Sequence, residues 1–133
     1  MSPTKRVLVT FLSLVVAFLV PCTLALAGSG CVTNLTCVVE DPLDPDYDAA
    51  GVAKLAQVKG EVTSNGPWHT GTLSVSCSNL TPGAMYTVWW IGTFTVGANG
   101  KGNISGGVGF QFGLEVAVVR EDGTTVLVGT LTP

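Results

Sequence analysis

The chain has 133 residues, which suits one domain and leaves little room for a second. Hydrophobic residues make up 47% of it, charged residues only 11%, and the formal net charge is −3. So much apolar sequence excludes a disordered charged tail, because such tails combine low hydrophobicity with high net charge. The shortage of lysine and arginine argues against a nucleic-acid partner, since binding to phosphates needs clustered positive charge.

The N-terminal segment has the features of a secretory signal peptide. A basic pair precedes an uncharged stretch at 7–20, and the small residues Ala25 and Ala27 suit cleavage by signal peptidase. We therefore predict a signal peptide at 1–27 and one domain at 28–133. The domain is then secreted or held on the extracellular surface, with no membrane span after cleavage. The alternative is an uncleaved anchor, because the apolar stretch is just long enough to cross a bilayer of about 30 Å.

Apolar and polar residues alternate through most of the remaining chain, which is the pattern of strands with one face in water. In 72–78, for example, Leu73, Val75 and Cys77 alternate with threonine and serine. Residues 49–57 could instead form a helical turn, but the alternation that follows favours a strand. We predict eight strands: 31–39, 54–63, 71–78, 84–91, 93–98, 103–110, 113–120 and 125–131.

Turn residues separate these strands. Asn99-Gly100 and Asp122-Gly123 tolerate two consecutive positive φ values, so each predicts a tight hairpin. Further reversals are marked by Gly66 and Pro67. Eight short strands with turn signals every 8 to 12 residues or so predict an all-β fold of about eight antiparallel strands, either a β-sandwich or a small barrel.

The stretch from Leu80 to Val88, L-T-P-G-A-M-Y-T-V, resembles the L-x-P-G-x-x-Y-x-V stretch of fibronectin type III domains. In this arrangement Pro82 and Gly83 turn the chain, Leu80 fills the end of the core, and Tyr86 folds back to bond the backbone upstream. The resemblance is local, and the chain continues well past the point where those domains end. It implies an immunoglobulin-like β-sandwich and carries no implication about function.

An acidic run between the first two strands is a candidate metal site. Asp44, Asp46 and Asp48 have the alternate spacing that opens a calcium-binding EF-hand loop. The rest of that loop fails, because Ala49 stands where glycine is needed and Leu55 where a bidentate glutamate is needed. We keep a weak calcium site as one interpretation, with no other cofactor, and a solvated loop as the alternative.

The cysteines predict a disulfide in an oxidising compartment. Cys37 and Cys77 both lie on the apolar faces of their strands, so they could meet across the core. Such a bridge would stabilise the fold by roughly 4 kcal/mol in the chain-entropy model. The rival pairing of Cys31 with Cys37 requires a bend, because in a regular strand the two residues lie roughly 20 Å apart.

No constellation of acid, base and nucleophile is evident, so we predict that the protein is not an enzyme. The only histidine, His69, stands in a turn beside proline, without the sequence context of a catalytic serine. We expect it at the surface or at the rim of the core. A small secreted enzyme is therefore the disfavoured alternative.

Two adjacent tryptophans suggest a binding surface. Neighbours on a strand point to opposite faces, so if Tyr86, Val88 and Trp90 face the core, Trp89 and Ile91 face solvent. An exposed tryptophan beside an exposed isoleucine could hold a partner chain, a sugar or a lipid.

These observations predict a secreted, non-catalytic module for adhesion or self-association, whose partners are other protein chains, including copies of itself. The contact would use the tryptophan surface and strand edges, among them the uncharged segment 126–128. The alternative is a carbohydrate-binding module that uses the aromatic residues Trp68, Trp89 or Tyr47, with a glycan as its ligand.

Overall fold

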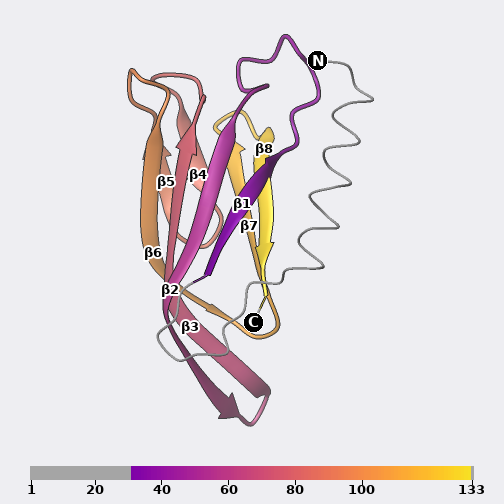
Figure 1. Ribbon diagram of the computed structural model, residues 1–133, viewed down its shortest axis with the longest axis vertical. Helices are drawn as coiled ribbons and strands as arrows, with labels where there is room; N and C mark the ends of the chain where they lie inside the picture. Colours follow the sequence, from indigo (N-terminus) through magenta and orange to yellow (C-terminus); the bar gives the residue numbers. More distant parts are fainter. Residues whose placement is uncertain (1–30, 133) are drawn as a thin grey trace.

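The computed structural model describes residues 31–132, and the predicted signal peptide at 1–27 lies outside these residues. The described chain is all-β, with eight antiparallel strands and no helix (Figure 1). No helix of the described part therefore has the length and hydropathy needed to cross a membrane. The strands are β1 (Cys31–Cys37), β2 (Ala50–Thr63), β3 (Gly66–Ser78), β4 (Met85–Val88), β5 (Gly92–Thr95), β6 (Gly102–Phe110), β7 (Leu114–Arg120) and β8 (Thr125–Leu131).

The strands form one nearly closed, barrel-like sheet in the order β5-β4-β7-β8-β1-β2-β3-β6. Strand β1 joins the two halves of this sheet. Its residues from Cys31 to Leu35 pair with β2, and Thr36 and Cys37 then pair with β8. All eight predicted strands are present at overlapping positions, but β2 and β3 begin earlier than predicted, and β1, β4 and β5 end earlier. Residues 50–57 belong to β2 and not to a helical turn.

The two ends of the strand order, β5 and β6, face each other without forming a ladder among the described pairings. The predicted turn at Asn99-Gly100 does form, with Gly100 at φ 76°, but it does not produce a paired hairpin. Side chains close the seam, because Phe94 lies over Gly102, where a Cβ atom would collide with its ring. The glycine at this position lets the two edges approach.

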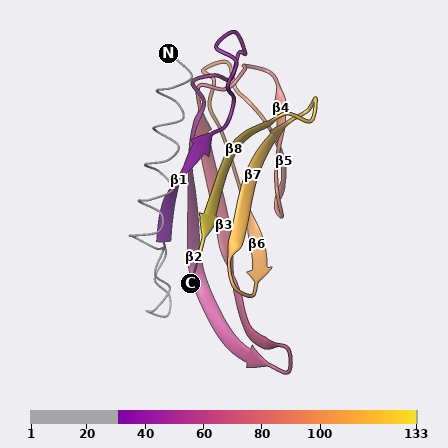
Figure 2. The ribbon, with the colours of Figure 1, turned by 90° about the vertical axis from the view of Figure 1, so that its right-hand side faces the viewer.

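Strands β2 and β3 extend past the other strands as a two-stranded arm (Figures 1 and 2). A β-bulge between Ala56 and Lys59 places Gln57 at φ 55° where the arm begins. The arm ends in the predicted reversal, at which Gly66 has φ 104°. A bulge increases the local twist and bends the bulged strand, so it redirects the arm.

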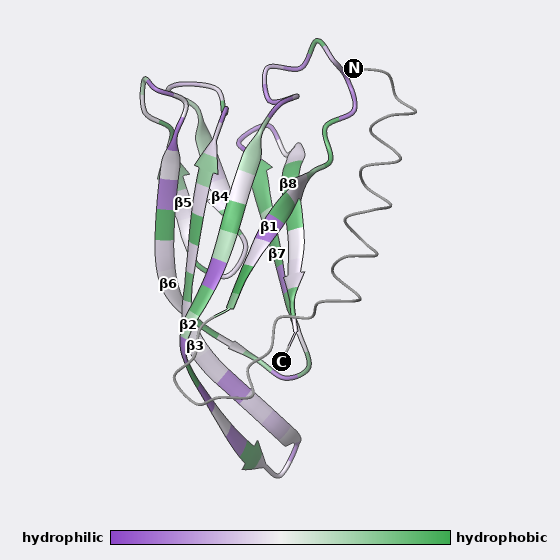
Figure 3. Ribbon diagram, in the orientation of Figure 1, coloured by the Kyte–Doolittle hydropathy of each residue, from purple (hydrophilic) through white to green (hydrophobic). Residues whose placement is uncertain are grey.

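The core lies inside the barrel and follows the alternation of the sequence, which Figure 3 shows as bands of hydropathy along the strands. Strand β8 pairs with β7 on one side and with β1 on the other, and the side chains of Val126 and Leu127 are completely buried in the core. The prediction that segment 126–128 is an open edge is therefore wrong. Among the described strands, β5 and β6 are the ones with a ladder partner on one side only.

Neither the predicted Cys37–Cys77 bridge nor the rival Cys31–Cys37 bridge is present among the described residues, where the Cys37 sulfur instead donates to the backbone carbonyls of Asp46 and Tyr47 at 3.5 Å. Leu35, Gly51 and Cys77 form one row across β1, β2 and β3. Two strand spacings, about 10 Å, therefore separate β1 from β3, which is more than a disulfide can span. Burial raises the pKa of the Cys77 thiol to about 12, so it stays protonated within the core.

Candidate functional site

A buried carboxylate organises the loop between β1 and β2. Asp46 is fully buried and is the only charged residue in the described core. Its oxygens accept hydrogen bonds from the Tyr86 hydroxyl at 2.8 Å, from the Thr81 amide at 3.0 Å and from the Thr81 hydroxyl at 2.9 Å. Arg120 donates a fourth bond at 2.9 Å. A charge without water needs such partners, and here the three partner residues lie in the turn before β4, in β4 and in β7.

Arg120 is the centre of a wider ion-pair network. Its guanidinium binds Asp44 through two nitrogens, at 2.8 and 3.1 Å, and binds Asp122 at 3.1 Å. The hydrogen bond from Arg120 lowers the pKa of Asp44 below its usual value and lowers the pKa of Asp122 to about 2. The three carboxylates in turn raise the pKa of Arg120.

This network bears on the calcium interpretation. Asp44 and Asp46 both face Arg120, so the guanidinium supplies the positive charge that a metal would bring. Asp48 is exposed, and its backbone carbonyl accepts a bond from Asn79. Among the described residues no group of three or more histidine, cysteine or acidic side chains could hold a metal ion.

The turn before β4 has the geometry expected from its motif. Leu80 is buried, Gly83 has φ 79°, and the exposed Pro82 lies between them. The Tyr86 hydroxyl accepts a bond from the Thr81 amide at 3.2 Å, five residues upstream. Burial raises the pKa of the Tyr86 phenol, which keeps its proton available to Asp46. The hydrogen bonds of Asp46 and Tyr86 hold the loop, β4 and β7 together.

The exposed tryptophans follow directly at the other end of β4. The strand ends at Val88, earlier than predicted, and a tight turn follows in which the Ile91 amide donates to the Val88 carbonyl at 3.3 Å. Trp90 has φ 80° and is 66% exposed, while Trp89 is 44% exposed. The prediction that Trp90 faces the core is wrong, because the alternation of faces stops where the strand stops.

Both tryptophan side chains are fixed in place. The Trp90 indole nitrogen donates to the Glu115 carbonyl at 2.6 Å, and the two indole rings meet edge to face with centroids 6.4 Å apart. Ile91 was predicted to share this surface, but it is partly buried and packs on Gly106 of β6. The exposed pair Trp89 and Trp90, called the tryptophan turn below, therefore lies next to the seam between β5 and β6.

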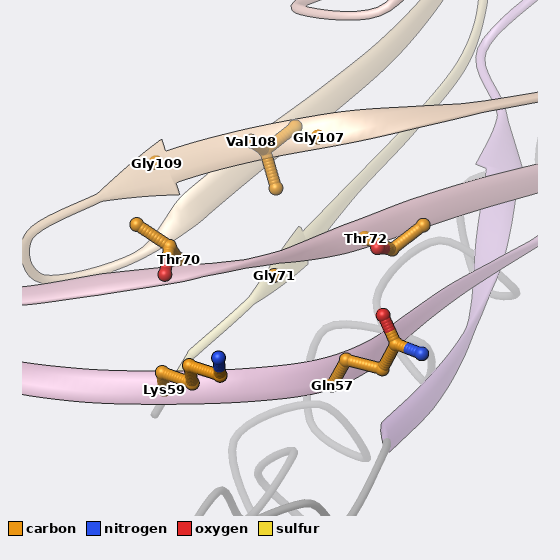
Figure 4. Close-up of a pocket in the computed structure, with 8 residues that line it drawn as sticks. All are labelled: Gln57, Lys59, Thr70, Gly71, Thr72, Gly107, Val108 and Gly109. Atoms are coloured by element: carbon orange, nitrogen blue, oxygen red, sulfur yellow. The ribbon is translucent and has the colours of Figure 1, made fainter.

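A second surface is an open groove of about 500 Å³ across β2, β3 and β6 (Figure 4). It is lined by Gln57 and Lys59 of β2 and by segments 70–72 and 107–109 of the other two strands. Trp68, which is 39% exposed, lies at its end. Figure 4 labels the lining residues, with Gln57 and Lys59 on β2, Thr70 to Thr72 on β3 and Gly107 to Gly109 on β6.

Of two other predicted positions, Tyr47 differs from expectation, whereas His69 lies at the rim of the core as expected. Tyr47 is buried, so the prediction of an exposed ring that could hold a sugar is wrong. Tyr47 comes directly after the buried Asp46 in the loop between β1 and β2. A loop has no regular alternation of faces, so the sequence could not indicate that this ring is buried. His69 is partly buried and stacks on Phe110 with centroids 5.3 Å apart. Sequence reasoning missed the exposure of Trp90 and the groove at Lys59, because both depend on where strands end and which strands pair.

Comparisons with known proteins identify no relative of the chain. No protein family, curated protein or solved structure matches the chain.

Proposed function

We propose that the chain is a secreted, non-catalytic module of immunoglobulin-like architecture that mediates adhesion or self-association through the tryptophan turn. Secretion rests on the signal-peptide pattern of 1–27. The architecture rests on the eight antiparallel strands and on the tyrosine contact of the fibronectin-like stretch. The contact surface rests on the geometry around Trp89 and Trp90.

The observation that carries the proposal is the backbone of Trp90. Holding the backbone of a non-glycine residue at φ 80° costs about 1 to 3 kcal/mol of folding free energy. Such a conformation persists only where the surrounding structure holds it. Glycine or asparagine would fit this turn with less strain. The chain instead places a large apolar ring there and leaves it 66% exposed. Exposed, fixed tryptophans are the side chains that contribute most to binding at protein interfaces.

A second copy of the chain is the partner that the neighbouring edge favours. Within residues 31–132, strand β6 has no ladder partner on its outer side, and it carries no charged residue along its nine positions. Uncharged edges offer free amide and carbonyl groups to another strand. Ile91 packs on Gly106, so the tryptophan turn adjoins this edge. A contact that begins at the rings can therefore continue along the backbone of β6 beyond Gly106, where the seam contacts of Phe94 and Ile91 end.

The experiment is sedimentation over a hundredfold concentration range, with variants that separate binding from folding. We expect the wild-type chain to associate and Trp90→Gly to weaken association about tenfold or more. Because glycine removes the strain at this φ, the melting temperature should stay within a few degrees of wild type. Trp68→Ala is the matched control, since it removes a half-exposed tryptophan from another surface and should leave association intact. A wild-type chain that stays monomeric, or a Trp90→Gly chain that associates like wild type, overturns the proposal.

A further inference from the structure

We propose that the groove across β2, β3 and β6 binds an acidic glycan, meaning a sugar chain that carries carboxylate or sulfate groups. This site is separate from the tryptophan turn and does not depend on the self-association proposed above.

The groove is formed by outward-facing positions of three paired strands. Ala56, Thr72 and Gly107 form one row across these strands, and Lys59, Thr70 and Gly109 form the next. Only β2 and β3 contribute side chains to these rows. The β6 positions in these rows are glycines, so no side chain fills the groove there. The threonine hydroxyls beside the groove can exchange hydrogen bonds with sugar hydroxyls.

Trp68 gives the groove an aromatic end. A Cβ atom on Gly109 would lie 2.8 Å from the Trp68 ring, so only glycine lets the indole rest on β6 at this point. The ring lies beside the polar rows and remains 39% exposed. An indole offers an apolar face and a polar N–H, which suits the C–H face of a sugar next to its hydroxyl groups.

The charges around the groove favour an anionic ligand. Lys54 and Lys59 both project from the outer face of β2, and no carboxylate of the described residues pairs with either within 4.0 Å. Arg120, by contrast, is surrounded by the acids of the loops. Glu61 is the one acid on this face, opposite Trp68. Two unpaired ammonium groups on a hydroxyl-rich surface therefore match a sugar chain with anionic groups.

Binding is tested by affinity electrophoresis and calorimetry with polygalacturonate, heparin and dextran, which carry carboxylates, sulfates and no charge. We expect a polyanion to bind, dextran to bind much more weakly, and added salt to weaken binding. Either polyanion supports the site, and the preferred one identifies the anionic group.

Variants locate the site. Lys59→Gln should weaken binding about fivefold, whereas Lys101→Gln, which makes the same charge change in the turn between β5 and β6, should not. Gly107→Val should abolish binding without unfolding the chain, because the nearest atom to an added Cβ at Gly107 is 4.0 Å away. Trp68→Ala should weaken binding, and Trp90→Gly should leave it unchanged.

Three results overturn the inference. They are no binding of either polyanion, equal losses for Lys59→Gln and Lys101→Gln, and undiminished binding by Gly107→Val. Equal losses would mean that only net charge matters. Self-association is measured separately, so either idea can fail alone.

Discussion

The two ends of strand β4 place aromatic residues in opposite environments. At one end Tyr86 is completely buried, and its hydroxyl bonds a carboxylate and a backbone amide. At the other end, directly after Val88, Trp89 and Trp90 are exposed. The difference lies in the backbone and its partners, since hydrophobicity alone would bury all three rings. Tyr86 stands inside the paired strand and has Asp46 beside it, whereas the tryptophans follow the last ladder position.

The buried end should give the largest effect on stability. Asp46→Ala leaves Arg120 short of one carboxylate and leaves the Tyr86 and Thr81 donors without their acceptor. We expect a loss of about 3 to 5 kcal/mol in the free energy of unfolding, which urea titration measures. Asp48→Ala is the control, because this exposed aspartate should change stability by less than about 0.5 kcal/mol. Equal effects of the two substitutions would mean that the buried network does not stabilise the loop.

The seam beside the tryptophan turn should give an intermediate effect. A Cβ atom on Gly102 would collide with the Phe94 ring, so Gly102→Ala forces β5 away from β6 and costs about 1 to 3 kcal/mol. Gly107→Ala on the same strand meets no atom closer than 4.0 Å and should cost little. Thermal unfolding of the two variants measures the difference. If both melt alike, side-chain packing does not hold the seam closed.

Much of the fold could be predicted because it depends on short-range pattern. Alternation located the strands, and the stretch around Pro82 and Gly83 located the turn that brings Tyr86 back to the chain upstream. The closure of the sheet could not be predicted in the same way. It depends on the pairing of β1 with both β2 and β8, and on the contact of Phe94 with Gly102. Both are contacts between segments that are distant in the sequence.

The candidate sites were less predictable for the same reason. The residues before Trp90 have the pattern of a continuing strand, so the sequence predicts no turn there. The one residue that indicates a turn is Gly92, which has φ 130°. The groove depends on the register that sets Gly107 and Gly109 beside the threonines of β3. A glycine shows from sequence that a side chain is missing, but only the register tells which face is hollowed.

The smallest expected effect is the loss of stability in acid. It should arise at the Tyr86 end of β4, where the carboxylates lie, and not at the tryptophan end. The folded-state pKa of Asp122 is about 2, against 3.8 ordinarily, and the pKa of Asp44 is also lowered. A carboxylate with a depressed pKa stabilises the folded state above its ordinary pKa and loses that contribution as the pH falls through the lower value. The melting temperature should therefore fall between about pH 4 and pH 2.

Asp122→Asn should make this decline shallower, because the substituted side chain no longer takes up a proton on acidification. Glu121→Gln removes one carboxylate from the neighbouring exposed position and should leave the decline steeper than in Asp122→Asn. Trp90→Gly should keep the wild-type slope, since the tryptophan turn has no part in the ion-pair network. Calorimetry at several pH values measures the slopes. Equal slopes in Asp122→Asn and Glu121→Gln would show that net charge, and not the contact with Arg120, sets the acid sensitivity of the buried end.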